Sequence, residues 1–219
     1  MTDGYKRQID NGKKWVEETV REMAQAEGII LEGRFEWREV SDYLIHRLII
    51  TYKGLRYNEA FSEGSLADCN PGDNYPASRE VRDRLASQIG CIFKTLRRDV
   101  LPYERYLTAS EREGVRLFVK RVRARFGDKI LKCCIFGSKV RGDYKPDSDI
   151  DILLVVDSDD WRIRDEISDI AAVIDAVDIA YGPGSGLSPV VYGKNEYKKN
   201  EDFRTFFVQE VEREGMPLG

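Results

Sequence analysis

Residues 134–156 read CIFGSKVRGDYKPDSDIDILLVV. An apolar run ends at Gly137-Ser138, a charged turn follows, and a second apolar run opens with Asp149 and Asp151. Side chains alternate faces along a strand, so these two carboxylates share one face, about 7 Å apart at the backbone. The opposite face is apolar and carries Ile150, Ile152, Leu154 and Val156. Core packing gives no reason for two acids at the start of a buried strand, so the pair indicates a chemical site.

The acids and the glycine-serine turn predict neighbouring sites for a cation and a phosphate. Two close carboxylates repel each other, and a shared divalent cation relieves that repulsion. Mg²⁺ suits the pair because it takes one or two carboxylates plus water and phosphate oxygens, with Mn²⁺ as a second possibility. Gly137 lets a phosphate approach the backbone, Ser138 offers a hydroxyl, and Arg141 can add donors one helical turn further on. The combination indicates metal-assisted phosphoryl or nucleotidyl transfer, while the Walker-type phosphate loop and the protein kinase motifs are missing from the sequence.

Gly137-Ser138, ten further residues and then Asp149-Ile150-Asp151 resemble the signature of the DNA polymerase β-like nucleotidyltransferase superfamily. The fuller stretch is similar to the minimal nucleotidyltransferase branch, which includes antitoxin partners of HEPN-type ribonucleases, and the likeness covers residues 108–215. The resemblance implies Mg²⁺-dependent transfer of a nucleoside monophosphate from a nucleoside triphosphate, with ATP the expected substrate. The implied acceptor is a hydroxyl or similar group on a protein, a small molecule or RNA. By position, Gly137 and Ser138 would hold the triphosphate together with Arg141, and Asp149 and Asp151 would be the catalytic and metal-binding residues.

A third carboxylate, which catalytic members of the superfamily usually carry on a later strand, is expected to be missing. Asp178 is the candidate, but the apolar periodicity around it places it on the side of a helix. The strand expected over residues 187–192 has Ser188 and no acid. Asp143 and Asp147 also lie near the motif, and we interpret them as solvated residues of the charged turn. Two hypotheses therefore stay open: an enzyme, and a catalytically weak or inactive binding module, such as an antitoxin-like partner of another protein.

The chain predicts a mixed α+β or α/β fold in two domains. Residues 1–100 form a small α+β domain of unknown role, with a helix over 11–28, a β-hairpin over 46–61 turning at Lys53-Gly54, a loop over 62–78 and a second helix from 78. Residues 101–219 form a nucleotidyltransferase domain in which a mixed sheet packs on helices. Its expected elements are a helix ending at 127, strands over 129–136, 149–157 and 187–192, a helix from 159 or 160 to 181, and a helix over 201–215.

Composition excludes several classes of protein. A net charge of −4 and a pI near 5.3 argue against a protein that coats nucleic acid. The four cysteines form no C-x-x-C pair, and His46 is the one histidine in the sequence, so a zinc site is poorly supported and buried thiols in a reducing cytosol are expected. We interpret His46 as structural. Because the sequence contains no apolar run long enough to span a bilayer, the protein is predicted to be cytoplasmic, without a membrane partner and with a possible protein partner.

Overall fold

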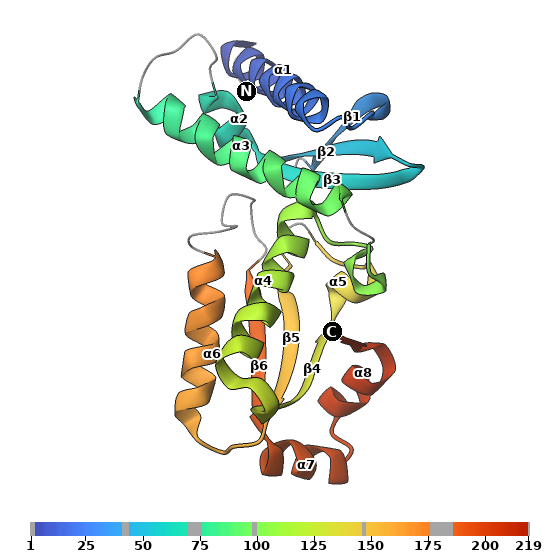
Figure 1. Cartoon of the computed structure of the whole chain (residues 1–219), viewed down its shortest axis with the longest axis vertical. Coiled ribbons are helices and arrows are strands. Elements are labelled where there is room, and N and C mark those ends of the chain that lie inside the picture. The colour runs from blue at the N-terminus through green and yellow to red at the C-terminus, as the bar shows by residue number, and fades with distance from the viewer. Residues whose placement is uncertain are drawn as a thin grey trace. The chain divides into compact units, whose positions relative to one another are not determined.

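The computed structural model describes residues 3–40, 44–69, 76–97, 100–145, 148–175 and 186–218. The chain divides into two compact units. The first contains Met1–Asp99 and Thr108–Ser110, and the second contains Val100–Leu107 and most of the chain from Glu111 onward. Figure 1 shows the elements of both units. No helix among the described ranges combines the length and the apolar character that a membrane span requires.

The N-terminal unit is a three-stranded antiparallel sheet with three helices. Its elements are α1 (Asp3–Ala26), β1 (Glu32–Val40), β2 (Ile45–Tyr52), β3 (Leu55–Ser62), α2 (Glu63–Asp68) and α3 (Pro76–Leu96). The strand order is β1-β2-β3. The predicted hairpin is confirmed, because β2 and β3 meet at Lys53 and Gly54, whose φ angles of 51° and 71° are those of a tight hairpin turn with both central residues left-handed.

Three sequence predictions for this unit were incomplete or wrong. The first helix begins at Asp3, eight residues before the predicted start at position 11. Strand β1 was not predicted, since its residues are largely exposed and show no clear apolar alternation. The stretch predicted as loop contains α2, which Ser62 caps by accepting a hydrogen bond from the Ser65 amide. Positions 70–75 of that stretch lie outside the described residues.

The C-terminal unit is a mixed four-stranded sheet with helices on both faces, which confirms the predicted fold class. After the one-turn helix η2 (Pro102–Glu104), its elements are α4 (Ala109–Phe126), η3 (Gly127–Lys129), β4 (Ile130–Phe136), α5 (Ser138–Arg141), β5 (Ile150–Val156), α6 (Trp161–Val173), β6 (Leu187–Gly193), α7 (Lys194–Asp202), α8 (Phe206–Glu214) and β7 (Met216–Pro217). The strand order is β6-β5-β4-β7. Strand β4 runs antiparallel to β5 and β7, whereas β5 and β6 are parallel.

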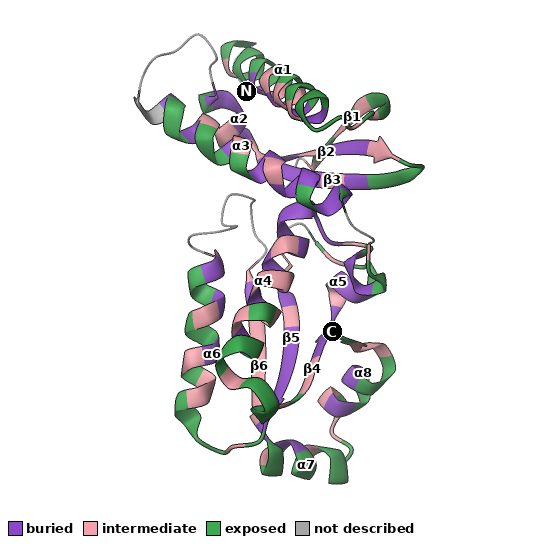
Figure 2. Cartoon of the chain, in the orientation of Figure 1, coloured by how far each residue is buried: buried purple, intermediate pink, exposed green. Residues whose placement is uncertain are grey.

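Strand β5 is the centre of this unit because both of its faces are covered (Figure 2). One face packs with α4 and α6, and its core includes Val115, Phe118, Ile150, Ile152, Leu154, Val156 and Ile167. The other face packs with α7 and α8 through Leu153, Val155, Tyr197, Val208 and Val211. Every residue of β5 is buried except Asp151, which is half-buried. The predicted facing of the strand is therefore confirmed.

The last helical region departs from the prediction. One helix was expected over 201–215, but the chain forms α7 and α8, separated by Arg204 with a φ of 47°. That left-handed residue interrupts the helical hydrogen bonding, and the separate α8 can then turn toward β4. The α6 helix begins after Asp160, which caps it as predicted. Its expected continuation to 181 falls partly on residues 176–185, outside the described residues.

Candidate active site

The glycine-serine turn lies beside the acid pair because β4 and β5 are antiparallel. Phe136, the last residue of β4, pairs with Asp151, the second residue of β5. The chain therefore leaves β4 at Gly137 next to the carboxylate of Asp151. Gly137 has a φ of 83°, and a Cβ built there would lie 2.4 Å from Asp151 Oδ2. Only glycine can occupy this position without displacing the acid.

A short helix follows the glycine. Helix α5 begins at Ser138, with Gly137 as its N-cap, and ends at Gly142 in the left-handed conformation. The carbonyl of Gly137 accepts hydrogen bonds from the amides of Val140 and Arg141, at 3.0 and 3.1 Å. The sequence-predicted Gly137, Ser138 and Asp151 are therefore gathered at one edge of the sheet.

Contacts with buried residues hold α5 in position. The Lys139 side chain is 1% exposed and donates to Glu111 Oε1 at 2.7 Å, with its ammonium 4.5 Å from the centre of the Tyr144 ring. Gly142 packs closely against Tyr106: a Cβ built on this glycine would lie 2.7 Å from the tyrosine ring. Separating this buried ion pair would leave an uncompensated charge in the interior, which is strongly unfavourable. The pair therefore holds α5 in place through Lys139.

Asp149 and Asp151 interact electrostatically. Burial raises the pKa of Asp151 by disfavouring its charged form, and the charge of Asp149 raises it further. Arg141 acts in the opposite direction, while Glu214 adds to the increase. Asp149 lies immediately before β5 and is exposed. The pair thus carries excess negative charge at the sheet edge, which a bound cation would offset.

Arg141, predicted to bind phosphate, is held by two carboxylates. Its Nη1 donates to Glu214 Oε1 at 2.6 Å, and its Nε lies 3.1 Å from Asp143 Oδ2. Asp143 is exposed, as expected of the turn, but it is paired with this guanidinium. Among the described residues the Nη2 group of Arg141 has no hydrogen-bond partner. Asp147 lies outside the described residues.

Glu214, the last residue of α8, completes the turn and was not predicted. Its side chain is 8% exposed, and its Oε1 accepts from the Gly137 amide at 3.0 Å as well as from Arg141. It therefore binds the backbone group at which a phosphate was expected. The local sequence offers no signal for this, because Glu210 and Glu212 are neighbouring acids on the same helix and only the tertiary fold distinguishes Glu214.

A further acid from the end of α6 approaches Asp149. Asp175 Oδ2 accepts from the Leu187 amide at 2.9 Å. A Cβ built on Gly186 would lie 3.3 Å from Asp175 Oδ2 and 3.7 Å from Asp149 Oδ1, so both carboxylates approach the same backbone position. Burial raises the pKa of Asp175. The hydrogen bond from the Leu187 amide lowers this pKa, and the charge of Asp149 raises it.

The candidate third acid from the sequence, Asp178, lies outside the described residues. On β6 the position paired with Asp151 is Ser188, so this strand offers a hydroxyl and no carboxylate at that point, as expected. Asp175 was not among the acids considered in the sequence, because it falls within the helix expected from 159 or 160 to 181.

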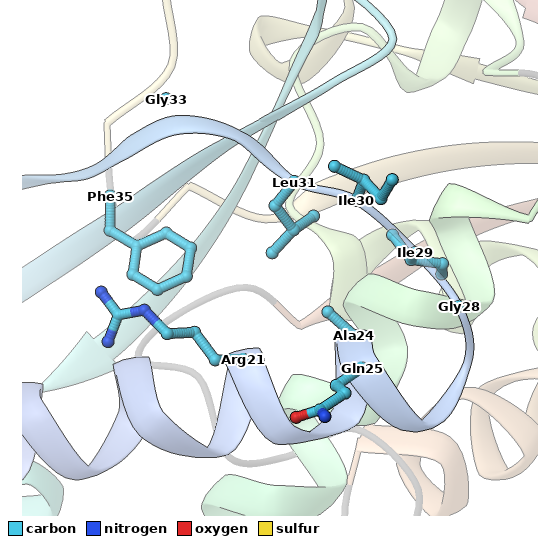
Figure 3. A pocket seen from close by; sticks show the side chains of 9 residues that line it. All are labelled: Arg21, Ala24, Gln25, Gly28, Ile29, Ile30, Leu31, Gly33 and Phe35. Atoms are coloured by element: carbon cyan, nitrogen blue, oxygen red, sulfur yellow. The ribbon is translucent and has the colours of Figure 1, made fainter.

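The N-terminal unit contains a groove of about 630 Å³ between the end of α1 and the segment that leads into β1 (Figure 3). Its lining is mainly apolar, including Ile29, Leu31 and Phe35. The Arg21 guanidinium stacks on the Phe35 ring at 4.7 Å. None of the predicted site residues lines this groove.

Residues 115–211 match the family model for the nucleotidyltransferase domain. The matched range begins within α4 and ends within α8, and it contains the glycine-serine turn and both strands that frame the acid pair. This part of the chain is a nucleotidyltransferase domain of the DNA polymerase β-like superfamily, as the motif predicted.

Two curated proteins of Methanocaldococcus jannaschii are similar to this chain, and both carry the provisional name protein adenylyltransferase. The first is 42% identical over 50 residues, which is 23% of this chain and 50% of that protein. The second is 29% identical over 106 residues, which is 48% of this chain and 96% of that protein. The chain thus spans half the length of the first relative and nearly all of the second.

Proposed function

We propose that the C-terminal unit transfers a nucleoside monophosphate from a nucleoside triphosphate, with ATP as the expected donor, to an acceptor hydroxyl. The observation that carries the proposal is the contact between the Gly137 backbone and the Asp151 carboxylate. It brings the glycine-serine turn next to an acid pair suited to a cation. The family match of residues 115–211 supports the same reaction class.

The acid pair fits a divalent cation. Asp149 and Asp151 offer the oxygen ligands that Mg²⁺ prefers, and a Cβ at Gly137 would fill the space beside Asp151. Mg²⁺ bound there would offset the negative charge of the triphosphate and of the departing pyrophosphate. Mn²⁺ has the same ligand preference and is the natural substitute in binding experiments.

The other site residues position the reactants. Ser138, the first residue of α5, can offer its hydroxyl to a phosphate. Arg141 can donate from Nη2 to a phosphate oxygen while Glu214 and Asp143 hold the rest of its guanidinium. The acceptor oxygen attacks the α-phosphorus, the bond to the bridging oxygen of the β-phosphate breaks, and pyrophosphate leaves. Asp175 is the described carboxylate that we assign to accept the acceptor's proton, since its raised pKa suits a general base.

The acceptor class that we propose first is a protein hydroxyl, because both relatives are named for the adenylylation of proteins. Small-molecule and RNA hydroxyls are alternative outcomes of the same experiment. The chain is incubated with nucleoside triphosphates labelled at the α-phosphate, Mg²⁺ and cell extract. Label should appear on a protein band and be lost in the Asp149→Ala/Asp151→Ala variant.

Nucleotide binding provides the second measurement. Calorimetry in the presence of Mg²⁺ should detect triphosphate binding by the parent chain and none by the double variant. Asp157→Asn is a matched control, because Asp157 follows β5 at its other end and pairs with Lys194. Equal triphosphate binding by parent and double variant would refute the metal role of the two acids.

A binding module without catalysis is the second candidate function. It is favoured by the bond between Glu214 and the Gly137 amide, which satisfies a phosphate-binding group within the protein itself. In that case the labelled nucleotide would not be transferred, and the chain would instead form a complex with another protein. Specific label transfer that depends on Asp149 and Asp151 would eliminate this hypothesis.

A further inference from the structure

A cluster of three ligand-type side chains lies in the N-terminal unit, separate in sequence from the acid pair of β5. Glu39 of β1 is the direct cross-strand partner of His46 in β2. Glu63 is the first residue of α2 and follows β3 directly. Register and chain path therefore gather the three, and their ligand atoms all lie within 4.8 Å of one another.

The imidazole of His46 is buried without a hydrogen-bond partner. The residue is 3% exposed, and neither Nδ1 nor Nε2 has a partner of acceptable geometry among the described residues. Its Nε2 lies 3.3 Å from Glu63 Oε1, near enough for contact but not aligned as a hydrogen bond. Burying an imidazole in this way is unfavourable, because both ring nitrogens lose their hydrogen bonds to water.

The distance between His46 Nε2 and Glu63 Oε1 is the one expected of two ligands of a bound metal ion. Two donors that bind Zn²⁺ at about 2.0–2.1 Å with tetrahedral angles lie about 3.4 Å apart. The Nε2 to Oε1 distance of 3.3 Å matches that spacing. We propose that Glu39, His46 and Glu63 bind a divalent transition-metal ion, for which Zn²⁺ is the test metal, at the junction of β1, β2 and α2.

The donor set distinguishes this site from the acid pair of β5. One imidazole and two carboxylates suit Zn²⁺ and its first-row neighbours, whereas Mg²⁺ favours oxygen ligands alone. The imidazole offers one nitrogen to the cluster, and each glutamate offers a carboxylate oxygen. Glu39 is exposed while the other two are buried, so the site opens to solvent on one side and keeps a position for water.

Lys13 is the group that opposes the metal. Its ammonium interacts electrostatically with His46 and lies 5.8 Å from the centre of the Trp37 ring. A positive charge near His46 would repel a cation bound there. Replacing Lys13 by a neutral residue should therefore raise the affinity of the chain for the metal. If the three side chains form only an ion-pair network, the replacement should not raise that affinity.

The test uses the full chain carrying Asp149→Ala/Asp151→Ala, so that the other candidate metal site is removed and failure of either proposal is seen separately. Calorimetry should show one Zn²⁺ bound per chain, and Mg²⁺ should not compete. Glu39→Gln, an exposed and nearly isosteric change, should weaken Zn²⁺ binding at least about tenfold. Glu36→Gln is the matched control, because Glu36 is an exposed acid of β1 paired with Arg56, and it should leave the affinity unchanged.

Two further variants and one spectrum complete the test. His46→Gln should abolish binding, and Lys13→Met should tighten it about threefold to tenfold. If His46→Gln does not fold, Glu39→Gln against Glu36→Gln decides. Co²⁺ should give the visible spectrum of nitrogen and oxygen ligation. A sulfur charge-transfer band, or unchanged affinity in both the Glu39 and His46 variants, would overturn the proposal.

Discussion

Asp151 and Glu59 are both acids in strands with raised pKa values, yet their surroundings differ. Glu59 in β3 is fully buried, which raises its pKa to about 7 against the effect of four hydrogen bonds. Those bonds come from Gln88, from the Ala60 amide, and from the amide and hydroxyl of Ser110. Asp151 is half-buried and faces Asp149, and its carboxylate accepts no hydrogen bond from the described residues.

The difference teaches that a raised pKa alone does not identify a functional acid. Glu59 accepts hydrogen bonds from Gln88 of α3 and from Ser110, which belong to the same compact unit, so its role is architectural. The excess charge at Asp151 is left for a ligand to offset. Changing each acid to its amide should therefore separate the two roles.

Asp151→Asn should have the largest effect, a loss of about 10³-fold in nucleotidyl transfer, because the variant loses a metal ligand. Its thermal stability should rise slightly, since the substitution removes the repulsion from Asp149. Labelled-nucleotide transfer and thermal unfolding measure the two effects. If Asp151→Asn is destabilised and still transfers nucleotide, Asp151 has an architectural role like that of Glu59.

Glu59→Gln should alter the stability of the chain and leave nucleotidyl transfer unchanged. A folded-state pKa of about 7 against an ordinary value of 4.5 means that the folded chain binds more protons between these pH values than the unfolded chain does. The stabilisation that Glu59 contributes should be fully present below pH 4.5 and be lost as pH rises through 7, by about 3 kcal/mol in total. Unfolding midpoints measured from pH 5 to 8 should fall less steeply for Glu59→Gln, and an identical slope would contradict the assignment.

Gly137→Ala should weaken triphosphate binding about 10²-fold, because the new methyl group meets Asp151 Oδ2 and the backbone at φ 83° becomes strained, at about 1–3 kcal/mol. Gly64→Ala is the control, since a methyl group on that helical glycine would meet no atom within 4 Å. Binding by calorimetry and stability by denaturant unfolding separate the two effects. Full binding in Gly137→Ala would break the link between the turn and the acid.

The sequence predicted the parts of the site that are local in the chain. Alternation in β5 placed Asp151 and the core residues on the correct faces. Glu214, Asp175 and the carboxylate partners of Arg141 were beyond its reach. Glu214 contacts Gly137 and Arg141, which lie 77 and 73 positions earlier in the chain. Charged residues in a turn or at a helix end look alike until the fold selects one.

The same limit explains the missed elements of the fold. Strand β1 consists largely of charged and exposed residues, and it is held by pairing with β2 and not by its own pattern. The division between α7 and α8 depends on one left-handed arginine, Arg204, which composition does not mark. The short α2 lies in a stretch rich in turn-forming residues, where its Ser62 cap was the available signal.

The hydrogen bond from the Gly137 amide to Glu214 joins residues 77 positions apart. A ribosome must therefore extend the chain well past the glycine-serine turn before that turn acquires its partner. Until α8 has been made and docks on β4, the Gly137 amide and the Nη1 group of Arg141 remain open to other anions. During synthesis the candidate site is thus among the last parts of the domain to reach its final form.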